Sequence, residues 1–368
     1  MIYLDSGATS FHKPAAVYRA VARAMQTCAN PGRGGYGAAM EASRVVYECR
    51  ETAAKLFHCS PEQVVLTTSC THGLNTAIRS VVKPRAKVVI SGFEHNAVTR
   101  PLHALGAEVR VAGRKLFDWQ DTLDDFGEKL KGADAAVFTH VSNVFGYILA
   151  VEEMASLCRM RGIPFVVDAA QSAGSLDVDL EKLGADFIAM PGHKGLLGPQ
   201  GTGLLLCAAE AQPLLYGGTG SASIPQTMPE DLPERLEAGT LNVPGYAGLT
   251  EGLRYLLRTG PEQIHAREHR QLKRCIQGLR QMGVQVFAGA HQAATVSFLP
   301  GPDCEEAAAR LARQGIAVRA GLHCAPFAHE SAGTLETGTV RVSFGYDASQ
   351  TQTDAFLKAA SKLPRFLQ

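Results

Sequence analysis

"DFIAMPGHKGLLGPQG", residues 186–201, joins a short apolar run to a loop rich in turn-forming residues. The apolar run, residues 186–190, predicts a buried strand. Residues 190–201 contain four glycines and two prolines, a composition that favours turns over helix or strand. Lys194 stands in the middle of this loop. A lone loop lysine is usually a solvated surface charge, so the residues that the fold brings around it decide its role.

Short apolar runs alternate with helical stretches over residues 62–208. Apolar runs without internal alternation, separated by helices, are typical of a largely parallel sheet covered on both faces. We therefore predict an α/β large domain with a mostly parallel sheet. Its expected strands are 62–68, 86–92, 134–142, 164–171, 186–190 and 202–208, and its expected helices are 71–82, 96–106 and 151–162.

The second part of the chain has a different pattern. Residues 209–245 form a connecting segment rich in proline and glycine, and a long helix is predicted near 246–283. Strand 293–299, helix 304–315, strand 338–345 and a final helix follow, which predicts a smaller α+β domain. We place the large domain at 1–245, with room for the N-terminal segment to pack on the smaller domain, and the small domain at 246–368.

The composition excludes several function classes. Across 368 residues the formal net charge is +1, and no block of like charges suggests a nucleic-acid or membrane-surface partner. No apolar stretch reaches the length of a membrane span, and the start "MIYLDSGATS" predicts no signal peptide. Nine cysteines without a C-x-x-C pair predict free thiols in a reducing cytoplasm and no metal site.

Polar residues gather where the predicted strands end. Ligands of such sheets lie beyond the carboxyl ends of the strands. Asp168 ends one strand, 26 residues before Lys194, and a carboxylate there can pair with the protonated pyridine nitrogen of pyridoxal phosphate (PLP). A helix N-cap is the alternative for Asp168, and a surface amide is the alternative for Gln171, which could otherwise bond a ring substituent.

Two further strand ends carry candidate cofactor ligands. "TSCTHGLN", residues 68–75, opens a predicted helix, whose N-terminal N–H groups and Thr71 hydroxyl favour a phosphate. Thr71 could equally be a simple N-cap. His95 follows another strand and could stack on an aromatic cofactor, or merely be packed.

Together these residues resemble the class V aminotransferase family of fold-type I PLP enzymes, and most of all its cysteine desulfurases and selenocysteine lyases. The resemblance runs nearly end to end. Its motifs are "YLDSGATS" at the N-terminus, "NPGRGG" (30–35), "EHNA" (94–97), "HVSNVFG" (140–146), "VDAAQSAG" (167–174), "GHKGLLGPQGTG" (192–203), "EAGTLN" (237–242) and "GIAVRAGLHCAP" (315–326).

The resemblance implies roles around the cofactor ring. Lys194 would be the Schiff-base lysine, and Asp168 would pair with the pyridinium nitrogen. Gln171 would bond the ring hydroxyl, His95 would stack on the ring, and Asn143 would lie beside both cofactor and substrate.

For the phosphate, the resemblance implies Cys70, Thr71, His72 and His193, together with Thr240 from the other subunit of a homodimer. Two positions depart from the family pattern. Cys70 stands where threonine is frequent, and Pro191 stands where a serine commonly donates to the phosphate.

"VRAGLHC" and "TVRVSFG" add groups for the substrate. A guanidinium binds a carboxylate through paired hydrogen bonds, although each arginine could instead form a surface ion pair. The resemblance makes Arg341 the main carboxylate-binding residue and Arg319 a nearby one. It makes Cys324 the nucleophile that takes sulfur from L-cysteine as a persulfide and leaves L-alanine; a buried structural thiol is the alternative.

The leading hypothesis is thus a PLP-dependent cysteine desulfurase. L-selenocysteine is the alternative substrate, and another class V lyase or aminotransferase is the alternative reaction, although that reaction would need no thiol at Cys324. A non-catalytic protein of the same fold is the alternative from another class, and Lys194, Asp168 and Arg341 argue against it. A protein that accepts sulfur or selenium is a candidate partner.

Overall fold

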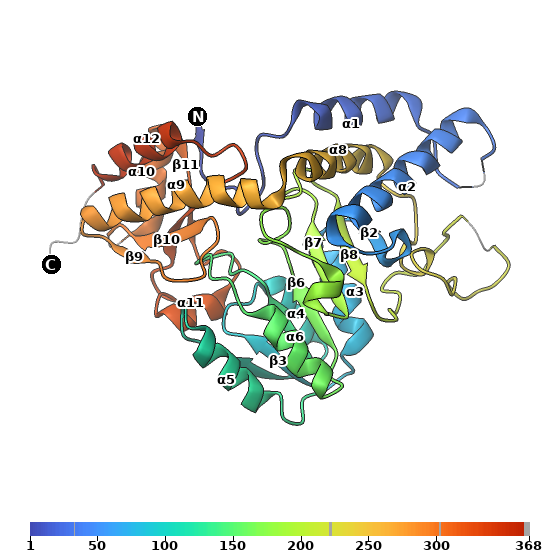
Figure 1. Ribbon diagram of the computed structural model, residues 1–368, viewed down its shortest axis with the longest axis horizontal. Coiled ribbons are helices and arrows are strands. Elements are labelled where there is room, and N and C mark those ends of the chain that lie inside the picture. The colour runs from blue at the N-terminus through green and yellow to red at the C-terminus, as the bar shows by residue number, and fades with distance from the viewer. Residues whose placement is uncertain (33, 221–222, 302, 364–368) are drawn as a thin grey trace.

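A sheet of seven strands organises the large part of the molecule (Figure 1). The computed structural model describes residues 1–32, 34–220, 223–301 and 303–363. β8 pairs with β2 and β7 in the antiparallel direction, and the remaining neighbours are parallel. The strand order is β2 (Val64–Thr67), β8 (Gly203–Cys207), β7 (Phe187–Pro191), β6 (Phe165–Asp168), β5 (Ala135–Thr139), β3 (Lys87–Ser91) and β4 (Glu108–Ala112).

Helices cover both faces of this sheet because successive side chains of each strand point to opposite faces. One face packs on α3 (Cys70–Val81) and α4 (Asn96–Ala104), where Val88 and Ile90 are fully buried. Val89 enters the core on the other face. That face is covered by α2 (Gly37–Phe57), α5 (Trp119–Lys129), α6 (Val151–Met160), α7 (Leu180–Leu183) and α8 (Val243–Thr259), and α1 (Ala15–Thr27) lies against α8.

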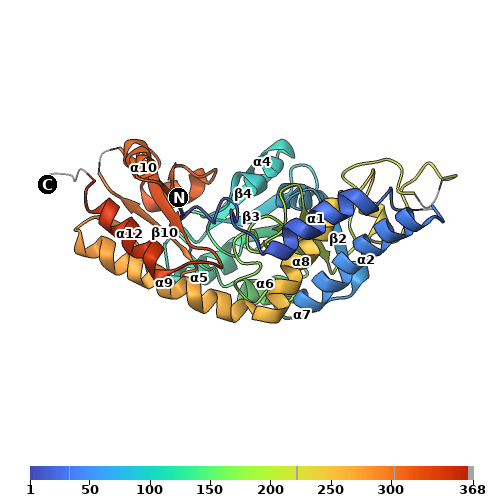
Figure 2. The same ribbon diagram turned by 90° about the horizontal axis from the view of Figure 1, so that it is seen from above.

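A second, antiparallel sheet lies at the other end of the molecule, and α9 (Pro261–Gln281) leads to it from α8 (Figures 1 and 2). Its order is β12 (Arg319–Gly321), β13 (Thr339–Ser343), β10 (Thr295–Leu299) and β9 (Gln285–Phe287). The first strand of the chain, β1 (Ile2–Tyr3), pairs with β11 (Ile316–Ala317). The accompanying helices are α10 (Cys304–Arg313), α11 (Pro326–Ala332) and α12 (Gln350–Ala360).

The predicted α/β architecture is confirmed, and each of the six predicted strands of the large sheet is present. The single long helix predicted near 246–283 is wrong. Gly260 has a φ of 82° and Pro261 follows it, so α8 ends there and α9 begins. The helix predicted to begin at Thr71 begins one residue earlier. The predicted domain boundary at 245/246 falls inside α8, and the division into two domains stays a prediction.

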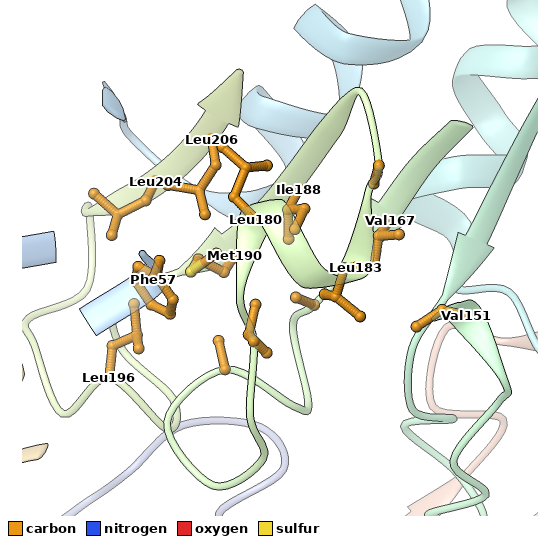
Figure 3. Close-up of a cluster of buried hydrophobic side chains, with 14 of the residues drawn as sticks. Phe57, Val151, Val167, Leu180, Leu183, Ile188, Met190, Leu196, Leu204 and Leu206 are labelled. Carbon is orange, nitrogen blue, oxygen red and sulfur yellow. The ribbon is translucent and has the colours of Figure 1, made fainter. Parts of the chain in front are cut away.

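The loop that carries Lys194 is anchored in the core on both sides. Met190, at the end of β7, and Leu196, two residues after Lys194, are fully buried. Figure 3 shows Leu196 in the same cluster as Phe57 and Met190. Buried residues on both sides of Lys194 therefore fix the position of its loop, although this loop is neither helix nor strand.

No helix in the described part of the chain is long and apolar enough to cross a membrane.

Candidate active site

A cavity of about 240 Å³ lies at the carboxyl ends of β5, β6 and β7. This position follows from the parallel strands, whose carboxyl ends meet at one edge of the sheet. Eight of the sequence-predicted residues line it: Cys70, Thr71, His95, Asn143, Asp168, Gln171, His193 and Lys194. None of His72, Thr240, Arg319, Cys324 and Arg341 is among the described residues that line this cavity.

Asp168 sits at the end of β6 and is only 3% exposed. Its Oδ1 accepts a hydrogen bond from the backbone N–H of Ala170 at 2.8 Å. The Cys70 thiol donates to the same oxygen at 3.5 Å. Burial, and next the charge of Asp168, raise the pKa of the Cys70 thiol well above its usual range, so Cys70 stays a neutral donor.

Lys194 shares this cavity with Asp168. Burial lowers the pKa of the Lys194 ammonium, and the positive charge of Arg341 acts in the same direction. The charge of Asp168 is the largest effect that opposes them. A lowered pKa favours the neutral amine, which has the lone pair needed to attack a carbonyl or to accept a proton.

His95 caps α4 with its ring. Its Nδ1 accepts the backbone N–H of Ala97 at 3.0 Å, which leaves the proton of the neutral ring on Nε2. Burial lowers the pKa of His95, so the ring is held neutral. A neutral, half-buried imidazole that lines the cavity can lie against a flat aromatic group.

The start of α3 forms another wall of the cavity. Ser69 is the N-cap, and its hydroxyl accepts the backbone N–H of His72 at 3.2 Å. Ser69 also lines the cavity, a position that the sequence reasoning passed over in favour of its neighbours. The His72 ring instead meets the Thr68 hydroxyl at 3.3 Å from its Nδ1. Helix N-termini carry unpaired N–H groups and partial positive charge, which suit an anion here.

His193 precedes Lys194 and ties its loop to the N-terminal segment. Its Nδ1 lies 3.1 Å from the Thr9 hydroxyl. Its carbonyl oxygen accepts hydrogen bonds from the hydroxyls of Thr9 and Ser10, both at 3.0 Å. Burial, and next the charge of Lys194, lower the pKa of His193 to about 4, so the ring is neutral near pH 7.

Cys324 is exposed, and its main chain is tied to the edge of this cavity. The carbonyl of Cys324 accepts the backbone N–H of Asn96 at 2.7 Å, one residue after His95. The carbonyl of His323 accepts the Asn143 amide at 2.8 Å. Both His323 and Cys324 have positive φ, 52° and 55°, so the chain makes a tight left-handed bend at the thiol.

Arg341 and Arg319 lie side by side on the paired strands β13 and β12. Asp5 bridges them: one oxygen lies 2.7 Å from Arg341 Nη2, and the other lies 2.8 Å from Arg319 Nη2. Arg341 is buried, and its Nη1 donates to the carbonyl of Asn143 at 3.0 Å. The sequence reasoning assigned no role to Asp5, although it quoted the motif "YLDSGATS" that contains it.

Thr240 is exposed and lies apart from Lys194, in a separate hollow of about 400 Å³ that also contains Arg50 and Glu237. Glu237 accepts two N–H groups of Arg50, at 2.6 and 2.5 Å, and the backbone N–H of Leu66 at 2.7 Å. Within one chain, therefore, Thr240 does not reach the cavity.

The donor set around Lys194 fits PLP. The cavity offers an amine for the aldehyde, a buried carboxylate for the ring nitrogen, a neutral imidazole for the ring face, and a helix N-terminus for the phosphate. In the described part of the chain, by contrast, no group of three or more His, Cys, Asp or Glu side chains could hold a metal ion. All nine cysteines, each within the described ranges, are free thiols.

Known proteins match the whole chain. The family model "Aminotransferase class-V" matches residues 2–356. A probable cysteine desulfurase from Pyrococcus abyssi is 32% identical, with 100% of this chain and 95% of that protein covered. The solved apo structure of a cysteine desulfurase from Thermococcus onnurineus NA1 is 33% identical, with a TM-score of 0.90 over 98% of this chain and 94% of its own. A cysteine desulfurase structure from Escherichia coli is 26% identical, with a TM-score of 0.86 and the same coverage. This chain belongs to the class-V aminotransferase family.

Proposed function

We propose that this chain is a PLP-dependent cysteine desulfurase that converts L-cysteine to L-alanine and keeps the sulfur as a persulfide on Cys324. The observation that carries the proposal is the attachment of the Cys324 loop to the cavity of Lys194. Two hydrogen bonds, from Asn96 and from Asn143, hold the main chain around the thiol beside residues that line this cavity. A transaminase or racemase has no use for an exposed thiol at that place.

The residues that would hold PLP follow from the donor set. Lys194 would bind it covalently, and Asp168 would keep its ring nitrogen protonated. Gln171 would reach the ring hydroxyl and His95 would cover the ring face. Ser69, Thr71 and His193 would surround the phosphate, with Cys70 at its edge. Bound in this way, PLP draws electrons away from the Cα of an amino acid and makes its proton removable.

The residues of the chain supply the other steps. Arg341 binds the substrate carboxylate, with Arg319 beside it, and Asn143 orients the substrate. The Nζ of Lys194 takes the Cα proton, because the lowered pKa of this lysine favours its neutral form. The Cys324 thiolate attacks the substrate sulfur, a sulfur–sulfur bond forms, and the carbon–sulfur bond breaks. Its electron pair goes to Cβ, which takes a proton. Lys194 then returns a proton to Cα, and alanine leaves.

The proposal extends to the assembly and its surroundings. A homodimer would bring Thr240 of one chain to the phosphate of the other, since Thr240 lies apart from the cavity of its own chain. The exposed Cys324 is open to a protein that accepts the sulfur. Nine free thiols suit a reducing compartment, and we propose the cytoplasm.

Alanine release from L-cysteine tests the function. The PLP-loaded protein should form alanine, and a reductant that removes the persulfide should keep turnover going after the first cycle. L-selenocysteine, measured in parallel, separates the two candidate substrates. If neither amino acid yields alanine while PLP stays bound, the proposed function is wrong.

A further inference from the structure

Asp5 is the acidic partner of both arginines proposed to face the substrate carboxylate. Its Oδ1 accepts Arg341 Nη2 at 2.7 Å. Its Oδ2 accepts Arg319 Nη2 at 2.8 Å and Arg319 Nε at 3.1 Å. Asp5 is 7% exposed and Arg341 is 2% exposed, so this ion pair is shielded from water, whereas the side chain of Arg319 is about half exposed and covers the pair on the solvent side.

The backbone holds Asp5 at this place. β1 pairs with β11 just before it, and Asp5 itself forms a bridge to Ser343, at the end of β13. The backbone N–H of Gly7 donates to the Ser343 hydroxyl at 2.7 Å. The carbonyl of Gly7 then accepts the Gln171 amide, which lines the cavity of Lys194, at 2.9 Å. The position of the Asp5 carboxylate is therefore fixed relative to both sheets.

Hydrogen-bonding capacity remains free on Arg341. Nη1 donates to the Asn143 carbonyl and Nη2 donates to Asp5. The buried Arg341 Nε, and the buried Oδ1 of Asn143, have no partner within the described part of the chain. A buried guanidinium with an unused N–H is poised for one more acceptor, because leaving it unpaired is costly.

We propose that Asp5 is a positioning residue that makes the substrate site selective for amino acids with an uncharged side chain. The inference rests on the proposed function. Asp5 pairs with Arg319 and offsets its charge. The cluster of Asp5, Arg319 and Arg341 therefore keeps one net positive charge. That charge matches the single α-carboxylate of cysteine. A second carboxylate on the ligand would meet an arginine already paired and the negative charge of Asp5.

The asparagine–aspartate pair isolates this effect, because the two side chains have nearly the same shape and differ by one charge. Binding of each to the PLP-loaded protein is measured by titration calorimetry. We expect wild type to bind L-aspartate about tenfold more weakly than L-asparagine, since a unit charge a few ångströms away has an effect of that order. In Asp5→Asn the difference should shrink to about threefold or less, because Arg319 is released and the repelling charge is gone.

Two control variants complete the experiment. Asp354→Asn makes the same change of net charge on the surface, where Asp354 pairs with Arg274, and should keep the wild-type difference. Asp5→Glu keeps the charge and should also keep the difference, even where both ligands bind more weakly. If Asp5 had a purely structural role, Asp5→Asn would bind L-asparagine and L-aspartate more weakly by the same factor, and the ratio of the two affinities would not change.

Three results would overturn the inference: equal binding of the two ligands by wild type, an unchanged ratio in folded Asp5→Asn, or a lost difference in Asp5→Glu. The first and third do not depend on the folding of Asp5→Asn. Alanine release from cysteine by wild type is measured on the same preparation. If wild type forms alanine while the ratio fails to move, the inference fails and the proposed function stands.

Discussion

Replacing Gly174 by alanine tests whether close backbone packing sets the position of Lys194. Gly174 has a φ of +99°, and a Cβ there would stand well within 3.0 Å of the Gly195 carbonyl oxygen. Gly195 follows Lys194 directly. Ordinary contact begins near 3.4 Å, so this oxygen, or the chain at residue 174, has to move by roughly 1 Å.

Such a shift is large for a group that transfers a proton. A misplacement of about 1 Å can lower a rate by about 100-fold. We therefore expect Gly174→Ala to form alanine from cysteine about 100-fold more slowly than wild type and to bind PLP more weakly. The backbone strain of the positive φ adds about 1–3 kcal/mol of lost stability. Alanine release, cofactor absorbance and urea unfolding measure the three effects.

Gly162→Ala is the matched control. Gly162 also has positive φ, +64°, but a Cβ there would meet nothing within 4 Å. This variant should lose about 1 kcal/mol of stability and keep its activity within about twofold. If Gly174→Ala is as active as Gly162→Ala, the packing of residues 174 and 195 does not position Lys194 and the reasoning is refuted.

Three further predictions concern single groups. Asp168→Asn should still bind PLP but form alanine more slowly by on the order of 100-fold, because an amide cannot stabilise the charged ring nitrogen; steady-state alanine release checks it. Glu237→Gln should lower the free energy of unfolding by about 3–5 kcal/mol, as it leaves the buried Arg50 without its anion; urea unfolding checks it. Burial lowers the pKa of His140 to about 4, so stability should fall as pH drops below 6.5, where the unfolded chain takes up the proton first. Between pH 6.5 and 5, protonation of this histidine should lower the free energy of unfolding of wild type by about 2 kcal/mol. In urea unfolding, His140→Gln should therefore lose about 2 kcal/mol less than wild type between these two pH values.

The sequence was most informative where residues are buried on both faces. Largely apolar runs such as those that form β5 and β7 could be assigned from the sequence, because short runs of this kind between helical stretches are typical of strands buried on both faces. β4 was missed because it is an edge strand whose "EVRVA" carries charged residues and is mostly half-exposed. The break between α8 and α9 was missed as well, although "TGP" at 259–261 contains both helix-breaking residues.

The part of the site that is formed by residues at the ends of parallel strands could be predicted from the sequence. Asp168 ends β6 and His95 comes shortly after β3, and both strands are parallel members of the sheet, so these residues lie near Lys194 at one edge of it. The link between Asp5 and Arg341 could not be found in this way, because 336 residues separate them and the contact depends on how the N-terminal segment reaches β13. Nor does the sequence of the first turn of α3 reveal that Ser69 lines the cavity, or that the ring of His72 lies against the Thr68 hydroxyl.

The central claim is that Cys324 removes sulfur from cysteine, and mass spectrometry of the peptide that contains Cys324 tests it most directly. PLP-loaded wild type is treated with L-cysteine without reductant and digested, and Cys324→Ala is treated in the same way. We predict one added sulfur atom on the Cys324 peptide of wild type, removed by a reductant, and no alanine from Cys324→Ala. Alanine formation from cysteine by Cys324→Ala at the wild-type rate, with no added sulfur on the wild-type peptide, would contradict the account.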